Sequence, residues 1–279
     1  MIVPAYAKLN LTLDVIGARE DGYHEIASVM QAISLHDLLR VEAAECRIFE
    51  TTGATIEGEN LVLKAARALE GAVSRALPFR IWLHKRIPIG AGLGGGSADA
   101  AAFLRVAPAL YGLRLDREQL HAIAVTVGQD VPFLMQGGTA LATGLGSTVE
   151  PLPSLDRSTR FVVVCPRVSV STATVYQAAP SSGGDARRSQ AVAAALRAGQ
   201  PLEPALLGND LEPATLTRYP EVAAAIEPLR ASIPGLRMTG TGAAFFARVK
   251  DHPAARAALE ASRRAGVAAF VCHPIRALS

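Results

Sequence analysis

One segment, residues 90–101 (GAGLGGGSADAA), has five glycines within seven residues and then an alanine-rich run typical of a helix. Glycine lacks a Cβ atom, so such a loop turns tightly and lets its backbone approach a ligand closely. The first N–H groups of the helix that follows have no intrahelical partner, and the helix dipole is positive there. The segment therefore predicts an anion-binding loop, most often one for phosphate.

Two familiar phosphate loops fit this segment poorly. A Walker A loop ends in Gly-Lys-Ser/Thr, whereas a glycine precedes Ser97 and no lysine follows it. The glycines also spell the dinucleotide fingerprint, which needs an acid at the end of a second strand about 20 residues further on. Asp116 stands at a tolerable distance, but residues 113–115 (LRL) make a poor strand. A glycine-rich hairpin without a ligand is the remaining alternative.

A lysine near the N-terminus could serve such a site. Residues 7–15 alternate between apolar and polar side chains, which predicts a half-buried strand with Lys8 on its polar face. A lysine on a strand is usually a surface residue. Lys8, however, stands between apolar neighbours in a sparsely charged strand, so a functional lysine is indicated equally well.

A carboxylate and a second glycine turn are further candidates. Asp130 lies in residues 128–132 (GQDVP), where it either caps the next turn or accepts the proton of an attacking hydroxyl. Residues 239–243 (TGTGA) could present backbone N–H groups to another anion, although such a turn is more often an ordinary hairpin. The six histidines form no metal-binding pattern, so a zinc site is not expected.

The composition indicates a globular chain. Of its 279 residues, 50% are hydrophobic and 19% are charged, and the net charge of +3 is too small to indicate nucleic-acid binding. The three cysteines, Cys46, Cys165 and Cys272, are far apart and are predicted to be buried thiols in a reducing compartment. Because neither a signal peptide nor an apolar run of membrane-spanning length is visible, we expect a cytoplasmic protein without a membrane partner.

Periodicity and turn residues predict the elements that would position these groups. We expect strands at residues 7–15, 24–35, 38–43, 79–87, 138–143, 160–165, 244–249 and 267–272. We expect helices at residues 60–76 with Asn60 as N-cap, from Ser97 to near Pro108, from Asp116 with Gln119 as its capping-box partner, and at 186–198, 221–232 and 253–265.

The chain is expected to be α+β with two domains. The proline-rich residues 150–154 are the best boundary, which gives domains of residues 1–153 and 154–279. A loop is expected at residues 180–184. In the second half, the order of strands and helices predicts helices packed on one antiparallel sheet.

Taken together, these motifs resemble a known superfamily. Residues 88–97 (PIGAGLGGGS) are similar to the phosphate loop of the galactokinase, homoserine kinase, mevalonate kinase and phosphomevalonate kinase superfamily. Within it, the combination of AKLNL and DGYH resembles the family that phosphorylates 4-diphosphocytidyl-2-C-methyl-D-erythritol. The supporting segments are residues 7–11, 21–24, 60–61, 88–97, 128–132, 209–212 and 239–243.

The resemblance implies a fold and an activity. The N-terminal, nucleotide-binding domain would have a ribosomal-protein-S5-like fold, and the C-terminal domain would be ferredoxin-like. The activity would be ATP-dependent phosphorylation of the substrate's 2-hydroxyl, in the non-mevalonate route to isoprenoid precursors. Mg²⁺ would bridge oxygens of ATP with few protein ligands.

Roles carry over from the family onto matching residues. Lys8 and Asp130 would be the catalytic pair, in which Lys8 stabilises charge and Asp130 takes the proton. Tyr23 would stack on the cytosine, although a tyrosine packed on the core beside an exposed histidine is about equally well indicated. The substrate side would comprise Asn10, Tyr23, His24 and Tyr176. The ATP side would comprise Asn60, Pro88, Gly90, Gly92, Leu93, Gly94, Gly95, Gly96 and Ser97, where Ser97 is either a Mg²⁺ ligand or a helix N-cap.

The chain departs from the family pattern at three positions. Ala98 replaces a frequent serine, Gln129 replaces a commoner alanine, and Arg167 stands where glycine is frequent and could alter the substrate rim. Two other functions remain open. One is a sister kinase for homoserine or mevalonate. Tyr23 and His24 argue against it, because those substrates have no flat base for these side chains to bind. The other is a nucleotide sensor without catalysis, against which the retained catalytic pair argues.

Overall fold

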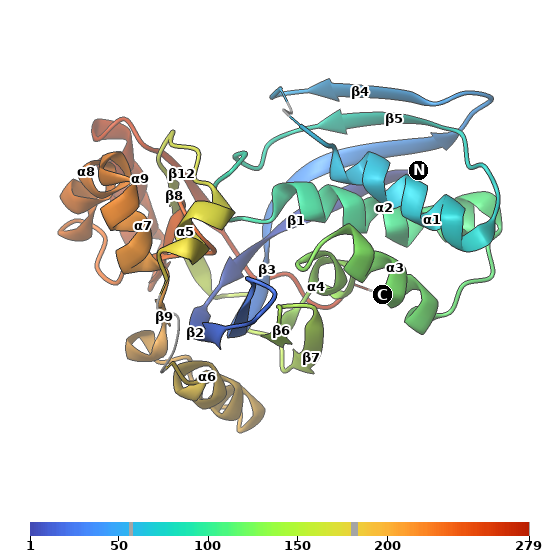
Figure 1. The fold of residues 1–279 in the computed structure, drawn as a ribbon. Coiled ribbons are helices and arrows are strands. Elements are labelled where there is room, and N and C mark those ends of the chain that lie inside the picture. The colour runs from blue at the N-terminus through green and yellow to red at the C-terminus, as the bar shows by residue number, and fades with distance from the viewer. Residues whose placement is uncertain (56–57, 180–183, 279) are drawn as a thin grey trace.

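The computed structural model describes residues 1–55, 58–179 and 184–278, which form two β-sheets with helices packed against them (Figure 1). The predicted loop at residues 180–184 lies outside the described residues except for Gly184. The strands are β1 (Ile2–Asn10), β2 (Thr12–Ala18), β3 (His24–Ala43), β4 (Ile48–Thr52), β5 (Phe79–His84), β6 (Thr139–Gly144), β7 (Thr148–Leu152), β8 (Arg160–Cys165), β9 (Gly208–Asn209), β10 (Arg237–Met238), β11 (Phe245–Val249) and β12 (Ala268–Cys272). The helices are α1 (Leu61–Val73), α2 (Gly95–Tyr111), α3 (Arg117–Val127), α4 (Val131–Gln136), α5 (Thr172–Gln177), α6 (Arg187–Arg197), α7 (Glu212–Arg218), α8 (Pro220–Arg230) and α9 (His252–Arg264).

The first sheet has eight strands built around the 20-residue strand β3. The first part of β3 pairs with β2 and β6, and its later part pairs with β1 and β5. Helix α2 packs directly on this sheet, and α1, α3 and α4 pack around α2 (Figure 1). We call this assembly the first lobe.

The second sheet has four antiparallel strands in the order β10-β11-β8-β12. Helix α9 packs on β8, β11 and β12, while α7 and α8 pack on each other beside them (Figure 1). This sheet with α5, α7, α8 and α9 forms the second lobe. It confirms the prediction that helices pack on one antiparallel sheet in the second half of the chain.

Two segments of the second half return to the first lobe. Strand β9 pairs in parallel with β2, and α6 packs against β2. Near the C-terminus, Ile275 N–H donates to the Ala32 carbonyl at 2.8 Å, so the last residues lie along β3. These contacts with the first lobe fix the distance between the two lobes and hence the width of the space between them.

The first predicted strand differs from the structure in two ways. It is broken at Leu11 into β1 and β2, and its polar side is buried along with its apolar side. The polar side chains of residues 8, 10, 12 and 14 are covered by contacts from the second half of the chain and by the glycine loop. The alternation of apolar and polar residues in one sequence does not show that residues distant in the chain bury these side chains.

Other predicted boundaries of strands and connections also differ from the structure. The two predicted strands at 24–35 and 38–43 are one continuous strand, β3. The predicted connection at 150–154 begins inside β7, whose one partner among the strands of the described residues is β6, so Pro151 occupies a sheet edge where a missing N–H is tolerated. Strands β4, β7 and β9 and helices α4, α5 and α7 were not predicted.

Local capping signals were read correctly. The Asn60 side chain accepts from Val62 N–H at 2.8 Å and caps α1. Asp116 and Gln119 form the complete capping box of α3. By contrast, Cys46 is exposed in the turn before β4, so its predicted burial was wrong, whereas Cys165 and Cys272 are buried. None of the helices in the described residues has the length and apolar character needed to span a bilayer.

Candidate functional site

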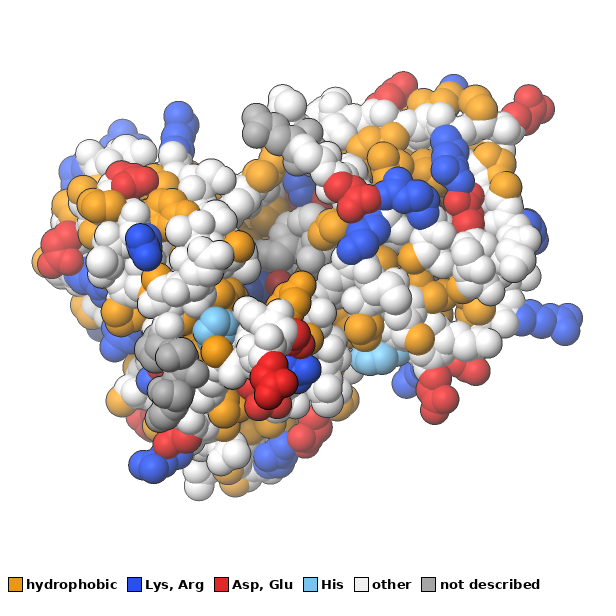
Figure 2. Space-filling view, in the orientation of Figure 1, with side chains coloured by type: hydrophobic (Ala, Val, Ile, Leu, Met, Phe, Trp, Pro, Cys, Tyr) orange, Lys and Arg blue, Asp and Glu red, His pale blue; other side chains and the backbone are white. Residues whose placement is uncertain are grey.

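A cavity of about 830 Å³ lies between the two lobes, where the surface is visibly hollowed (Figure 2). Every site residue predicted from the sequence lines it, and they come from both lobes. They are Lys8, Asn10, Tyr23, His24, Asn60, Pro88, Gly90, Gly92, Leu93, Gly94, Gly95, Gly96, Ser97, Asp130 and Tyr176.

The glycine loop opens helix α2 as the sequence indicated, but the helix begins earlier than predicted. It starts at Gly95, and Gly94 is its N-cap, with φ of 71° and no side-chain cap. The interpretation of Ser97 as an N-cap is therefore wrong, because Ser97 lies inside the first turn. Because no side chain caps this turn, its N–H groups and the positive end of the helix dipole are available to an anion.

The loop is held in place from both lobes. Lys8 N–H donates to the Leu93 carbonyl at 3.0 Å, and Ala244 N–H donates to the Ala91 carbonyl at 3.1 Å. At Gly92, where φ is +74°, a Cβ atom would lie 2.3 Å from the Thr239 carbonyl oxygen. Glycine is therefore required at this position for the loop to touch the second lobe.

Lys8 and Asp130 meet beside the loop. The Lys8 ammonium lies 3.7 Å from Asp130 Oδ2, and the Lys8 side chain is only 4% exposed. Lys8 is thus not a surface residue. Asp130 stands at the N-cap position of α4, yet its side chain makes no capping hydrogen bond. Its carboxylate is 30% exposed and available to a ligand.

Asn10 fixes the position of Lys8. Its Oδ1 accepts from Lys8 Nζ at 2.5 Å and from Gly240 N–H at 2.9 Å, while its Nδ2 donates to Ser28 Oγ at 2.8 Å. The amide thus ties β1 to β3 and to the second lobe. These bonds give Asn10 a positioning role; its predicted contact with substrate stays a prediction.

The second glycine turn, residues 239–243, connects β10 to β11 and lines the cavity through Gly240 and Thr241. The N–H of Gly240 donates to Asn10, and that of Gly242 donates to the Thr239 carbonyl at 3.1 Å. These two N–H groups already have protein acceptors. The predicted second anion site is therefore not supported by them, and the turn serves to hold the lobes together.

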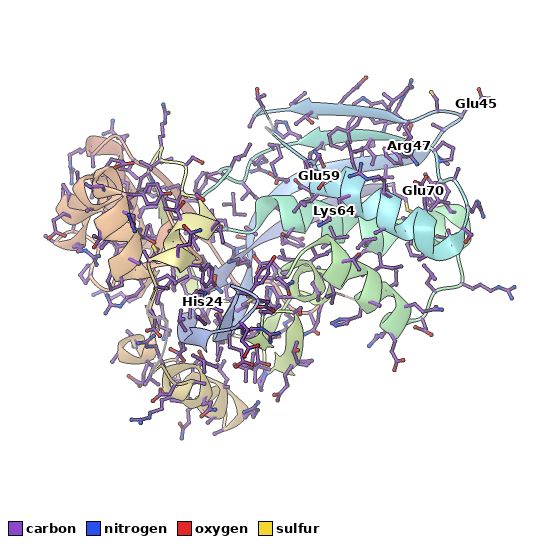
Figure 3. The ribbon with its side chains drawn as sticks, viewed as in Figure 1. His24, Glu45, Arg47, Glu59, Lys64 and Glu70 are labelled. Carbon is purple, nitrogen blue, oxygen red and sulfur yellow. The ribbon has the colours of Figure 1, made fainter. Side chains whose placement is uncertain are left out.

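Aromatic rings line the other part of the cavity. His24 lies at the start of β3 (Figure 3). Its ring is 5.3 Å from that of Tyr176 on α5, at an interplanar angle of 38°. Tyr23 is 61% exposed. The alternative of a core tyrosine beside an exposed histidine is therefore wrong. Burial, together with the negative charge of nearby Asp130, raises the pKa of the Tyr176 hydroxyl, so it stays protonated.

A buried ionic cluster beneath the loop was not predicted. The Lys85 ammonium pairs with Asp37 and, at 2.7 Å, with Asp99 in the first turns of α2. Asp37 also accepts from Arg86 N–H and, at 2.8 Å, from Ile87 N–H, which fixes the entry to the loop. Burial raises the pKa of Asp99 to about 8. One signal was available, because Asp99 is a charged residue within an alanine-rich helix.

Three buried side-chain atoms in the described residues have no hydrogen-bond partner. They are His24 Nδ1, Asp99 Oδ1 and Gln129 Oε1, and all three residues line the same cavity. Buried polar atoms are normally paired, because an orphaned one keeps its full desolvation penalty. Their shared location indicates a polar ligand that reaches both the loop side and the aromatic side.

Comparison with known proteins agrees with this geometry. Residues 60–138 match the family described as GHMP kinases N terminal domain, and residues 188–268 match GHMP kinases C terminal. A 4-diphosphocytidyl-2-C-methyl-D-erythritol kinase of Pelotomaculum thermopropionicum is 42% identical over 273 residues, covering 93% of this chain and 93% of that protein. A crystal structure of a 4-(cytidine 5'-diphospho)-2C-methyl-D-erythritol kinase is 36% identical with a TM-score of 0.77, covering 98% of this chain and 99% of that one.

The chain therefore belongs to the GHMP kinases and has their two α+β domains. A homoserine kinase from Cytophaga hutchinsonii shares the fold, with a TM-score of 0.68 at 16% identity over 99% of this chain and 94% of that one. Within the GHMP kinases, the chain falls in the family of 4-diphosphocytidyl-2-C-methyl-D-erythritol kinases.

Proposed function

We propose that this chain transfers the γ-phosphoryl group of ATP to the 2-hydroxyl of 4-diphosphocytidyl-2-C-methyl-D-erythritol, in non-mevalonate isoprenoid precursor synthesis. The observation that carries the proposal is the Lys8–Asp130 pair at 3.7 Å beside the open N-terminus of α2. A carboxylate without a capping bond, beside helix N–H groups that no side chain caps, supports a base next to a phosphate site. The two relatives named above at 42% and 36% identity carry the name of kinases of this substrate.

The catalytic pair suits an in-line displacement. Asp130 hydrogen-bonds the attacking hydroxyl and takes its proton as the new O–P bond forms, and the bond from the γ-phosphorus to its bridging oxygen breaks to release ADP. Lys8, held by Asn10, offsets negative charge that develops on the phosphoryl oxygens. The N–H groups of Gly95 and Gly96 hold phosphate oxygens at the positive end of α2.

The residues present also fit Mg²⁺, which prefers oxygen ligands and usually binds through substrate phosphates with one or two protein groups. A Cβ atom on Gly128 would lie 3.9 Å from Ser97 Oγ, so that hydroxyl faces the turn that carries Asp130. Ser97 would hold the ion, which neutralises charge on the phosphates when bound. The loop amides and Lys8 position the phosphates on the protein side.

The adenine and cytosine would bind at separate ends of the cavity. Asn60 and Pro88 line it near the loop and would contact ATP. Tyr23, His24 and Tyr176 would recognise the cytosine, with a ring against its face and the unpartnered His24 Nδ1 at its polar edge. Homoserine and mevalonate offer no such flat base.

The finer fold assignments belong to the same proposal. A ferredoxin-like second domain is supported by the chain order β8, α8, β10, β11, α9, β12 and by the sheet order β10-β11-β8-β12, which follow the β-α-β-β-α-β pattern. We also keep the S5-like first domain, the boundary between residues 153 and 154, and the cytoplasmic location as predictions.

A substrate screen tests the function. ATP consumption is measured with the cytidine substrate, homoserine and mevalonate in parallel, and the product is identified by ³¹P NMR. We expect turnover with the cytidine substrate alone. Turnover of homoserine or mevalonate instead would indicate a sister kinase. Tight ATP binding with no turnover of any alcohol would indicate a nucleotide sensor.

A further inference from the structure

Gln129 is a polar residue of the cavity for which the reaction above has no use. It stands directly before Asp130 and lines the cavity, and its Oε1 is buried without a hydrogen-bond partner. In the sequence, this position is also a departure from the pattern that the chain resembles. A longer side chain that buries an unpaired amide oxygen is unfavourable unless a ligand supplies the donor.

The surroundings of Gln129 place it on the acceptor side of the cavity. A Cβ atom on Gly146 would lie 3.5 Å from Ile26 Cδ1 and 4.0 Å from Gln129 Cβ, so these three residues are neighbours. Ile26 follows His24 by two residues on β3, so both side chains lie on one face of that strand. Gln129 therefore sits between the strand that carries His24 and the catalytic carboxylate.

We propose that Gln129 determines which hydroxyl of the polyol is phosphorylated, by hydrogen-bonding a hydroxyl adjacent to the reacting one. The inference rests on the proposed function and deepens it. The substrate's 2-hydroxyl is tertiary and is flanked by a primary hydroxyl on C1 and a secondary one on C3. Asp130 alone accepts a proton from any of them, so a second contact is needed to select one.

A carboxamide suits this task chemically. It offers an acceptor and donors to a hydroxyl, which itself both donates and accepts. It is uncharged, so it neither competes with Asp130 for Lys8 nor repels the diphosphate of the substrate, as a glutamate would. A glutamine with only a structural role would instead have its oxygen paired within the protein.

The test compares the parent enzyme with Gln129→Met, which keeps the length and removes the amide, and with Gln129→Ala, which guards against a packing defect of the methionine. Gln190→Met is the matched control, since Gln190 is exposed on α6. For each protein we measure KM for ATP, kcat and KM for the cytidine substrate and for its 1-deoxy and 3-deoxy analogues, and the thermal unfolding midpoint. The site of phosphorylation is read from ³¹P NMR, because a phosphate on the tertiary carbon shows no coupling to a carbinol proton.

We expect both Gln129 variants to raise KM for the natural substrate by about tenfold, the ratio that one neutral hydrogen bond contributes. KM for ATP and the control's constants should not change. The deoxy analogue that lacks the hydroxyl bound by Gln129 should be an equally poor substrate for the parent and for the variants. The variants should also form some product whose phosphorus signal is coupled to a carbinol proton. The unfolding midpoint should be unchanged or higher, because an orphaned buried oxygen has been removed.

Several results would overturn the assignment. They are an unchanged KM with a single tertiary product, equal losses for ATP and the cytidine substrate, or a lower unfolding midpoint in both variants. The parent is measured first, so a failure of the proposed function is seen separately, as a parent that does not phosphorylate the cytidine substrate. That outcome overturns both inferences.

Discussion

Replacing Asp130 by asparagine separates catalysis from stability at one position. The carboxylate makes no helix-capping bond and is 30% exposed, and its nearest cation, Lys8, keeps Asn10 Oδ1 as a partner at 2.5 Å. Lys8 is buried, but an asparagine Oδ1 at position 130 can still accept from its ammonium, so the free energy of unfolding should fall by about 1–3 kcal/mol. Loss of a general base should lower kcat at least about a hundredfold, or about 2.7 kcal/mol in activation free energy.

Asp116→Ala is the matched control for this experiment. Asp116 is exposed and caps α3 by accepting from Gln119 N–H at 2.8 Å. Removing that cap should cost about 1 kcal/mol of stability and leave kcat unchanged. Urea unfolding and steady-state turnover with the cytidine substrate are measured for both variants. A kcat within about tenfold of the parent for Asp130→Asn would remove Asp130 as the base.

Three further predictions concern the loop, the base and the buried cluster. Gly94→Val should weaken ATP binding at least about tenfold and the cytidine substrate much less, as calorimetry can show, because φ is +71° and the new Cβ would lie 3.2 Å from Lys8 Cγ. Tyr23→Ala should weaken the cytidine substrate about ten- to a hundredfold with ATP affinity unchanged; equal binding by variant and parent would refute the stacking role. Asp99 has a pKa of about 8 in the folded state, above the ordinary 3.8, so between these pH values the folded state holds more protons than the unfolded state. The free energy of unfolding should therefore fall as pH rises from about 4 to about 8. In the Asp99→Asn variant the free energy of unfolding should change less with pH over this range. A slope equal to that of the parent would contradict the role given to Asp99.

Local chemistry explains what could be predicted from the sequence. The capping box of Asp116 and Gln119 involves residues three positions apart, and the Asn60 cap reaches only Val62. Strand β8 has the predicted bounds, residues 160–165, because its run of apolar β-branched residues is buried in the middle of its sheet. Such signals depend on neighbours in the chain, so a single sequence contains them.

The remaining features depend on contacts between distant residues. The sequence predicted a first strand buried on one side only, but Asn10 on its polar side is buried and bonds to Gly240, which is 230 positions away. Equally, Lys85 pairs with Asp37 across 48 positions. Neither partner is visible from periodicity, because alternation reports only which side chains share a face. The glycine loop, Lys8 and Asp130 were singled out by their residue types and spacing, whereas the other residues of the candidate site were found through motif resemblance.

The buried cluster also explains how an anion-binding loop can stand above two carboxylates. If Asp37 and Asp99 were both ionised, the cluster with Lys85 would carry a net negative charge beneath the glycine loop and oppose phosphate. Burial raises the pKa of Asp99 to about 8, which favours the protonated form of this carboxyl and so reduces the negative charge beneath the loop. The positive end of helix α2 then acts on a bound phosphate against less opposing charge, while the hydrogen bonds of Lys85 still fix the first turns of the helix.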